Sequence, residues 1–257
     1  MLDARQDRPL YRQLTDQLRR EVARLRPGER IASEPELALI HSVSRFTVTK
    51  AVEALVDEGL VVRRQGKGTF VAAPPLKRAP FHLRSFTEAV MAEGRRPTSD
   101  LLSFGPVNWR AGLPYDPSEP LIQLERLRRV DGTPMAIHRS VLSAALVAET
   151  GLTEAKAAEP QFSLYRFYED AGLRIDHGFE SLTARKATPS ERKRMRLDSD
   201  GIVTVVTRRS FRADGRVLDV VDAVHDSRRY VYQALLQRDP DRPVRSISNE
   251  VGGGKDV

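Results

Sequence analysis

Apolar residues recur every three or four positions through the first 25 residues of the chain, a spacing typical of a helix with one buried face. The helix begins after Pro9 and ends at Arg26-Pro27-Gly28, where proline and glycine interrupt the pattern. Its apolar stripe consists of Leu10, Leu14, Leu18, Val22 and Leu25.

Two more helices with clear start signals follow. Ser33-Glu34-Pro35-Glu36 combines a capping serine, a glutamate that can close a capping box, and a proline in the first turn, so a short helix begins here and runs to about His41. Ser44 caps the next helix, and Gly59 ends it. The core-facing residues of this third helix are Val48, Ala51, Val52 and Leu55. Two helices joined by a short turn predict a helix-turn-helix.

After Gly59 the pattern changes from helical to β-prone. Segments 60–63 and 69–71 predict two short strands, and the glycine-containing segment 65–68 between them predicts a hairpin turn. A hairpin directly after a helix-turn-helix is a wing. The first part of the chain is therefore expected to be a winged helix-turn-helix.

A composition shift marks the end of this first unit. Segment 72–80 is rich in proline, carries cations and has little to bury, so it predicts a linker. We expect a DNA-binding domain over 1–73, a linker over 74–80, a second domain over 81–238 and a fraying tail over 239–257.

The second domain alternates strand-like and helical segments. Two hairpins are indicated by Asp131-Gly132 and Asp214-Gly215, each between alternating segments. The expected strands are at about 99–107, 120–130, 134–142, 173–186, 202–212 and 216–225, and the expected helices at 85–93, 143–150, 161–171 and 188–196. Neighbouring strands joined by hairpins predict a mainly antiparallel α+β domain.

Charge points to a polyanionic partner for the first unit. The chain carries 42 basic and 35 acidic side chains, a net charge of +7, and residues 1–78 hold 15 of the basic and 10 of the acidic ones. A basic surface that is merely solvated is the alternative interpretation. The absence of cysteine excludes disulfides and thiolate chemistry, and the absence of long apolar runs or a signal-peptide core predicts a cytoplasmic protein.

Groove geometry suggests which side chains contact DNA. Only solvent-facing residues at the start of a recognition helix reach base edges, and Arg45 can form a bidentate contact with guanine. Wing glycines allow close approach, while wing cations and nearby hydroxyls reach phosphate. Singly, each residue is equally explained as a cap, a turn or a solvated charge; their order favours DNA binding. The expected set is Ser33, Glu34, Arg45, Thr47, Thr49, Lys50, Arg63, Arg64, Gln65, Gly66, Lys67, Gly68 and Thr69.

These segments resemble the GntR family of transcription regulators. The family pattern is matched in order over about residues 8–73, with Ala32 in place of a usual proline and Thr49-Lys50 in place of a usual arginine. The matching segments are Pro9-Leu10-Tyr11-Arg12-Gln13-Leu14, Ala32-Ser33-Glu34, Ser44-Arg45-Phe46-Thr47-Val48, Leu55-Val56-Asp57-Glu58-Gly59-Leu60 and Gly66-Lys67-Gly68-Thr69-Phe70-Val71.

The second domain resembles the UTRA effector-binding domain of the HutC branch of this family, a fold similar to chorismate lyase. The resemblance rests on Ser85-Phe86-Thr87-Glu88, Leu124-Glu125-Arg126-Leu127-Arg128, Gly132-Thr133-Pro134, Ser163-Leu164-Tyr165 and Arg229-Tyr230-Val231-Tyr232. It implies a homodimeric repressor that binds a palindromic operator and responds to a small anionic metabolite, such as a sugar phosphate, a phosphonate or a carboxylate.

The resemblance also implies an effector site. Arg126 and Arg128 share strand parity and point to one face, which indicates either anion recognition or pairing with acidic neighbours. His138 stands where sugar-phosphate-binding members tend to have glutamate, and His225-Asp226-Ser227 replaces a stretch that is commonly Arg-Gly-Asp, so the resemblance does not by itself imply a standard amino-sugar phosphate as the effector. The implied set is Ser85, Phe86, Thr87, Arg126, Arg128, His138, Ser163, Tyr165, Glu180 and Tyr230.

Two other functional classes remain open at this point. The five histidines show no metal-binding spacing, and the chain has no nucleophile elbow, phosphate-binding loop or dinucleotide fingerprint, so we expect no catalysis, no metal and no cofactor. The alternatives to a ligand-responsive regulator are a constitutive DNA-binding protein and an enzyme acting on a small carboxylate in the second domain.

Overall fold

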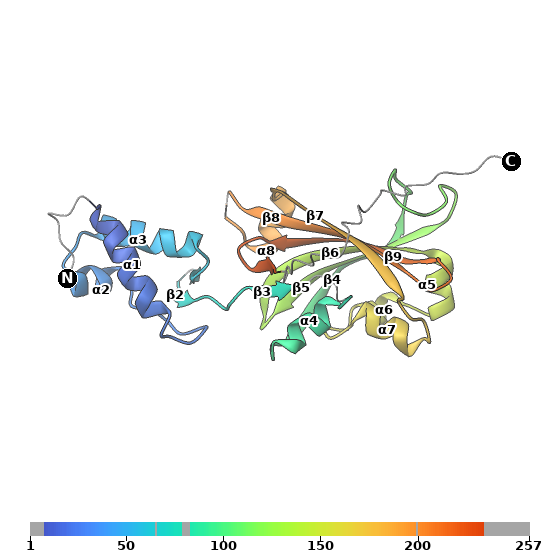
Figure 1. Ribbon diagram of the computed structural model, residues 1–257, viewed down its shortest axis with the longest axis horizontal. Helices are drawn as coiled ribbons and strands as arrows, with labels where there is room; N and C mark the ends of the chain where they lie inside the picture. Colours follow the sequence, from blue (N-terminus) through green and yellow to red (C-terminus); the bar gives the residue numbers. More distant parts are fainter. Residues whose placement is uncertain (1–7, 65, 79–82, 199, 234–257) are drawn as a thin grey trace, which may run out of the picture.

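The computed structural model describes residues 8–64, 66–78, 83–198 and 200–233. Figure 1 shows a small helical lobe and a larger lobe built on a sheet. The small lobe, here called the head, contains α1 (Leu10–Val22), α2 (Glu34–His41), α3 (Arg45–Asp57) and the antiparallel hairpin of β1 (Val61–Arg64) and β2 (Gly68–Val71). The predicted winged helix-turn-helix is confirmed.

The head is held together by the apolar stripes that the sequence indicated. Leu14 of α1 packs against Val48, Val52 and Leu55 of α3, and all four side chains are fully buried. Ser33 and Ser44 cap α2 and α3 as expected, and Ser33 and Glu36 complete a capping box. The expectation for Leu25 was wrong, because α1 ends at Val22 and Leu25 is exposed.

The segment expected to be a plain linker contains a strand. β3 (Leu76–Arg78) pairs in parallel with β10 (Tyr230–Tyr232), with Leu76 opposite Tyr230. Leu76 is only 2% exposed, so this segment does bury apolar surface. The sequence prediction failed here because the partner strand lies more than 150 residues away in the chain.

A six-stranded sheet forms the larger lobe, and every neighbouring pair of its strands is antiparallel. The strand order is β4-β5-β6-β9-β8-β7. The bounds are β4 (Pro97–Val107), β5 (Leu121–Val130), β6 (Thr133–Ser143), β7 (His177–Lys186), β8 (Ile202–Phe211) and β9 (Val217–Asp226). This sheet confirms the predicted mainly antiparallel α+β domain. The local turn signal was reliable because Asp131 and Gly132 adopt the positive φ angles that a tight hairpin needs.

Helices cover the sheet on both faces. Tyr168 of α7 is fully buried in a cluster with Leu124, Leu142 and Leu218 of the sheet, whereas Met195 of α8 packs against the opposite face. The helices are α4 (Phe86–Ala92), α5 (Ala144–Thr150), α6 (Glu154–Ala157), α7 (Leu164–Asp170) and α8 (Pro189–Met195). The short helix α6 was not expected from the sequence. No helix in the described ranges is long and apolar enough to cross a membrane.

One edge of the sheet stands out for its exposure. β7 is an edge strand, and none of its residues is buried. Phe179 and Leu182 on β7 are 62% and 38% exposed, and Ile202 at the start of β8 is 44% exposed. The unpaired backbone groups of such a strand can accept a further strand.

Candidate functional sites

The outer face of α3 carries the side chains that sequence reasoning assigned to base contacts. Arg45 and Lys50 are exposed, and Thr47 and Thr49 are half-buried. Arg45 forms no ion pair with any described residue, so its guanidinium is available to a ligand. Phe46, which the expected set omitted, is 69% exposed between Arg45 and Thr47.

Several of the expected DNA-contacting residues are engaged within the head. The carboxylate of Glu34 accepts a hydrogen bond from Oγ1 of Thr49 at 2.7 Å and another from Nη2 of Arg63 at 2.6 Å. Glu34 therefore holds the start of α2 against α3 and the wing, and it is a positioning residue. The free cation expected at Arg63 is a partner in an exposed ion pair.

The hydroxyl groups expected to contact phosphate also interact within the head. Ser33 bonds Glu36, and Thr47 bonds the cap Ser44. Thr69 is only 9% exposed, so it faces the head interior rather than a duplex. Ser33 and Thr47 therefore have hydrogen-bond partners within the head, and Thr69 is buried; their expected contacts with phosphate stay a prediction.

The wing leaves its tip open. Gly66 and Lys67 are exposed, and Gly66 has a φ of +69°, a conformation that glycine adopts without strain. Gly68 has a φ of +108°, and a Cβ there would lie 2.9 Å from the Arg30 side chain. The guanidinium of Arg64 stacks 4.7 Å from the ring centroid of Phe70. Gln65 lies outside the described residues.

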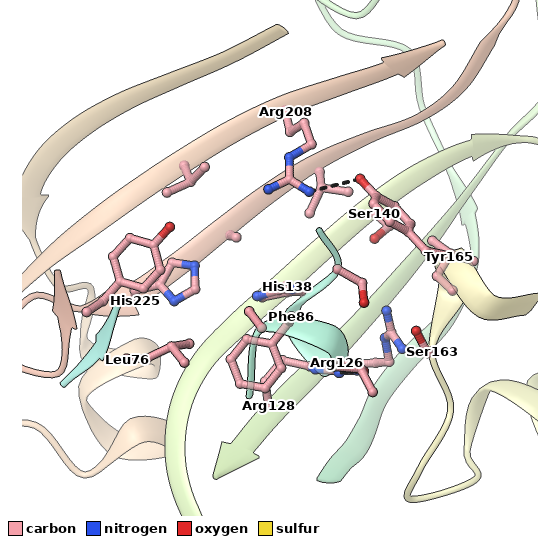
Figure 2. Close-up of a pocket in the computed structure, with 18 of the residues that line it drawn as sticks. Leu76, Phe86, Arg126, Arg128, His138, Ser140, Ser163, Tyr165, Arg208 and His225 are labelled. Carbon is pink, nitrogen blue, oxygen red and sulfur yellow. Dashed lines mark hydrogen bonds between the residues drawn. The ribbon is translucent and has the colours of Figure 1, made fainter. Parts of the chain in front are cut away.

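A pocket opens on the sheet face that α4 and α7 cover, and Figure 2 shows its lining. It encloses about 710 Å³ of space free of protein atoms, part of it open to solvent. Nine of the ten residues expected to bind the effector line it: Ser85, Phe86, Thr87, Arg126, Arg128, His138, Ser163, Tyr165 and Tyr230. Glu180 is the exception: it lies on β7 and pairs with Arg208, which lines the pocket.

Two buried arginines dominate the charge of the pocket. Arg126 and Arg128 are 4% and 3% exposed, and both donate to the carbonyl oxygen of Phe162, at 3.1 and 3.3 Å. Among the described residues neither has a carboxylate within 4.0 Å, and neither Nε has a hydrogen-bond partner. Burial lowers the pKa of Arg126 to about 10, and burial together with the charge of Arg126 lowers the pKa of Arg128 well below its ordinary value. Because an arginine guanidinium stays protonated in proteins, both groups are buried cations held at an energetic cost.

The hydroxyls at the start of α4 already have partners. Ser85 caps the helix through Glu88, and Oγ1 of Thr87 accepts a hydrogen bond from Nη2 of Arg128 at 2.8 Å. Thr87 therefore orients the guanidinium of Arg128. Both hydroxyl oxygens act as acceptors in these bonds, so each O–H group can still donate to an anion, as expected from the sequence.

The opposite wall is aromatic. The His138 ring lies edge-on to Phe86 at 5.4 Å and to His225 at 5.5 Å, and the His225 ring stacks on Tyr230 at 3.9 Å. Burial, with smaller contributions from His225 and the nearby arginines, lowers the pKa of His138 well below its ordinary value. His138 is therefore neutral at pH 7, and its Nε2 has no hydrogen-bond partner. Leu76 of β3 completes this wall (Figure 2).

Comparison with known proteins identifies both parts of the chain. The pattern described as "Bacterial regulatory proteins, gntR family" matches residues 10–71, and the pattern described as "UTRA domain" matches residues 92–231. The chain belongs to the GntR family. Within that family it is a HutC-type, DNA-binding transcriptional regulator with a UTRA effector-binding domain.

Similar proteins cover nearly the whole regulator. An HTH-type transcriptional regulator of Mycobacterium tuberculosis is 31% identical over 234 residues, which cover 90% of this chain and 87% of the relative. The transcriptional repressor NagR of Bacillus subtilis is 28% identical over 237 residues, which cover 90% of this chain and 96% of NagR. The crystal structure of PhnF from Mycobacterium smegmatis superimposes with a TM-score of 0.60 at 23% identity, covering 88% of this chain and 99% of that one, which shows the shared fold.

Sequence reasoning missed several pocket residues of the regulator. Arg208 donates to Glu180 at 2.6 Å and to the hydroxyl of Tyr165 at 3.0 Å, the bond dashed in Figure 2. Ser140, Asp219 and His225 also line the pocket. The available signal was strand parity: Ser140 lies two residues after His138, and Asp219 and His225 share one face of β9.

Asp219 is expected to make the stability of the regulator depend on pH. Its side chain is fully buried, and burial raises its pKa to about 6 from an ordinary 3.8, against smaller lowering effects of Ser210, Arg208 and Arg126. The folded protein keeps a proton between about pH 4 and 6 that the unfolded chain releases, so the contribution of Asp219 to stability falls as pH rises through that window.

Asp219→Asn removes this titration. The variant should be more stable than wild type by up to about 3 kcal/mol at pH 8, with the difference shrinking as pH falls toward 5. Urea unfolding at each pH, followed by the fluorescence of Trp109, measures the free energies of unfolding of wild type and variant. A stability difference that is equal at pH 8 and pH 5 would show that Asp219 does not titrate in this range.

Proposed function

We propose that this regulator is a homodimeric repressor whose affinity for a palindromic operator is controlled by a small anionic metabolite bound in the UTRA pocket. The observation that carries the proposal is the pair Arg126 and Arg128, two buried guanidiniums that form no ion pair within 4.0 Å among the described residues, in a pocket whose buried carboxylate, Asp219, offsets the charge of Arg126 only in part. Segments 1–73 and 81–238 are assigned to DNA and to the effector respectively.

Electrostatics favours an anion as the missing partner. An uncompensated buried charge costs several kcal/mol, and two of the same sign also repel one another. A phosphate, phosphonate or carboxylate placed between Arg126 and Arg128 would neutralise both and would satisfy the vacant Nε donors. The His138, His225 and Tyr230 wall suits the remaining, less polar part of the ligand.

The names of similar proteins support repression as the outcome. NagR is a transcriptional repressor, and MngR of Escherichia coli, 24% identical over 242 residues, is a repressor of a mannosyl-D-glycerate transport and metabolism system. Because the family and the similar proteins are transcription regulators, we assign the pocket to binding without turnover.

A dimer follows from the size of the head and from the exposed edge of the sheet. One winged head makes too few contacts for typical operator affinity, so two heads on half-sites one helical turn apart are needed. β7 provides a surface for pairing two copies, because its outer edge pairs with no other strand in the part of the chain that the structure describes, and Phe179 and Leu182 are exposed on it.

The proposed contacts of the head with DNA are tested by two variants of the full-length protein, Arg45→Ala and Lys67→Ala. Arg45→Ala should weaken binding to a selected operator by about 1–3 kcal/mol and relax base preference at one position in each half-site. Lys67→Ala should weaken specific and random duplexes to a similar extent and reduce the salt slope by about 1, because it contacts phosphate.

The measurement is fluorescence anisotropy over a salt series, with the number of chains per duplex determined by analytical ultracentrifugation. Lys67→Ala is the matched control for Arg45→Ala, since both remove one exposed cation from the head. Unchanged operator affinity in Arg45→Ala, or one chain per operator, would contradict the proposed docking.

A further inference from the structure

The outer face of the recognition helix presents an aromatic ring that the core does not use. At about 100° per residue, Phe46 points almost directly away from the mean direction of the buried residues Val48, Ala51, Val52 and Leu55. No other side chain of the first turn points so directly outward, since Arg45 and Thr47 lie on its two flanks. With 69% of its surface exposed, Phe46 is poised to enter whatever groove α3 enters.

Charges along the same face limit which part of α3 can approach DNA. Lys50, one turn after Phe46, has its Nζ 4.8 Å from the Phe46 ring centroid and 5.6 Å from that of Tyr11. Further along, the outward residues are the acidic Glu53 and Asp57, both exposed. A polyanionic duplex is therefore attracted to the first two turns and repelled from the end of the helix, which places Phe46 at the point of contact.

We infer that Phe46 is a specificity-determining residue that contacts the C5-methyl group of a thymine in each half-site. The thymine methyl is the apolar group that base pairs present in the major groove, and a phenyl ring has no hydrogen bond to offer to the other base edges. The flanking cations Arg45 and Lys50 hold the ring among phosphates and bases, a setting that disfavours an apolar protein partner. The inference rests on the proposed docking of α3.

The test removes single methyl groups from the DNA. An operator is first selected from random duplexes with the full-length protein, and each thymine is then replaced in turn by deoxyuridine, which lacks only the methyl. Wild type should lose about 4-fold in affinity at one thymine of each half-site, the factor equivalent to ~0.8 kcal/mol for one buried methylene-sized group.

Variants assign that loss to the ring. Phe46→Ala should bind the thymine operator about 4-fold more weakly and show no further loss with deoxyuridine, while Arg45→Ala should bind more weakly but keep the deoxyuridine penalty. Leu39→Ala, a truncation of an 81% exposed side chain on α2, should behave as wild type. Since Phe46 is exposed, its variant should retain the wild-type melting temperature.

Three results would overturn the inference, and they are distinguishable. A wild-type protein that selects a sequence but tolerates deoxyuridine everywhere would contradict thymine recognition and leave the repressor proposal standing. A full deoxyuridine penalty in Phe46→Ala would assign the contact to another residue. Failure to select any sequence would count against the proposed function itself, and against this inference with it.

Discussion

Arg128→Met should abolish the response of the regulator to small anions while leaving the empty protein at least as stable as wild type. Methionine retains the apolar stem but removes a buried cation next to Arg126, so the loss of this repulsion and of the desolvation cost offsets the loss of the hydrogen bonds to Thr87 and Phe162. The same change removes half of the anion site. We expect affinity for a bound anion to fall by about 2–4 kcal/mol, roughly 30- to 1,000-fold.

The experiment is decisive because Arg128→Met should lower the affinity for anions without lowering the stability of the empty protein. Thermal melting of the full-length protein is measured alone and with inorganic phosphate, methylphosphonate or urocanate, and an anion that stabilises wild type should not stabilise the variant. Arg129→Met is the matched control, since Arg129 is the next residue on β5 but pairs with Asp100 at 2.7 Å on the other side of the strand. An undiminished anion-induced shift in Arg128→Met would remove the main support for the proposed effector class.

Leu55→Ala should unfold the head selectively and eliminate operator binding. Leu55 is fully buried in the head core, and leucine-to-alanine changes at such sites cost about 2–5 kcal/mol. A domain of this size has little stability in reserve, so the loss is comparable with its total free energy of unfolding. The UTRA domain has its own apolar clusters and should remain folded.

Hydrogen exchange separates the two domains in this test. Amides of α3 should exchange much faster in Leu55→Ala, while the fluorescence of Trp109, the single tryptophan of the chain, should report an unchanged urea transition in the UTRA domain. Leu39→Ala makes the same chemical change at an exposed site of the same domain and should alter stability by less than about 0.5 kcal/mol. Unchanged exchange in α3 would show that the head core tolerates the cavity.

The elements of the fold that the sequence predicted correctly are those whose signals are local. Helical periodicity located α3 from Val48 to Leu55, and Asp131-Gly132 located a hairpin, because a few adjacent residues determine each feature. β3 was missed because its stabilising partner, β10, is close to it only after the chain has folded. Leu76 alone in a proline-rich segment gives no period to detect.

The same distinction between local and long-range signals applies to the residues of the two candidate sites. Arg126 and Arg128 were found from strand parity and family resemblance, but only the structure shows that neither forms an ion pair within 4.0 Å among the described residues and that the carboxylate of Asp219 shares their pocket. The ion pair of Glu180 with Arg208 could not be predicted, because it depends on the register of β7 against β8. Phe46 was overlooked since an apolar residue in a helix suggests a core position until its direction is measured against Val48 and Val52.

The position of Leu76 in the pocket wall sets a limit on how far the two lobes can separate. Only four residues lie between Val71, at the end of the wing, and Leu76, and the five Cα–Cα steps that join them span at most about 18 Å when fully extended. As long as Leu76 remains buried in the pocket wall, the end of the wing stays within a distance of it that is shorter than one turn of the double helix. A metabolite that displaces Leu76 from inside the pocket would therefore shift the attachment point of the head, and only a few peptide bonds separate that point from the DNA-binding wing.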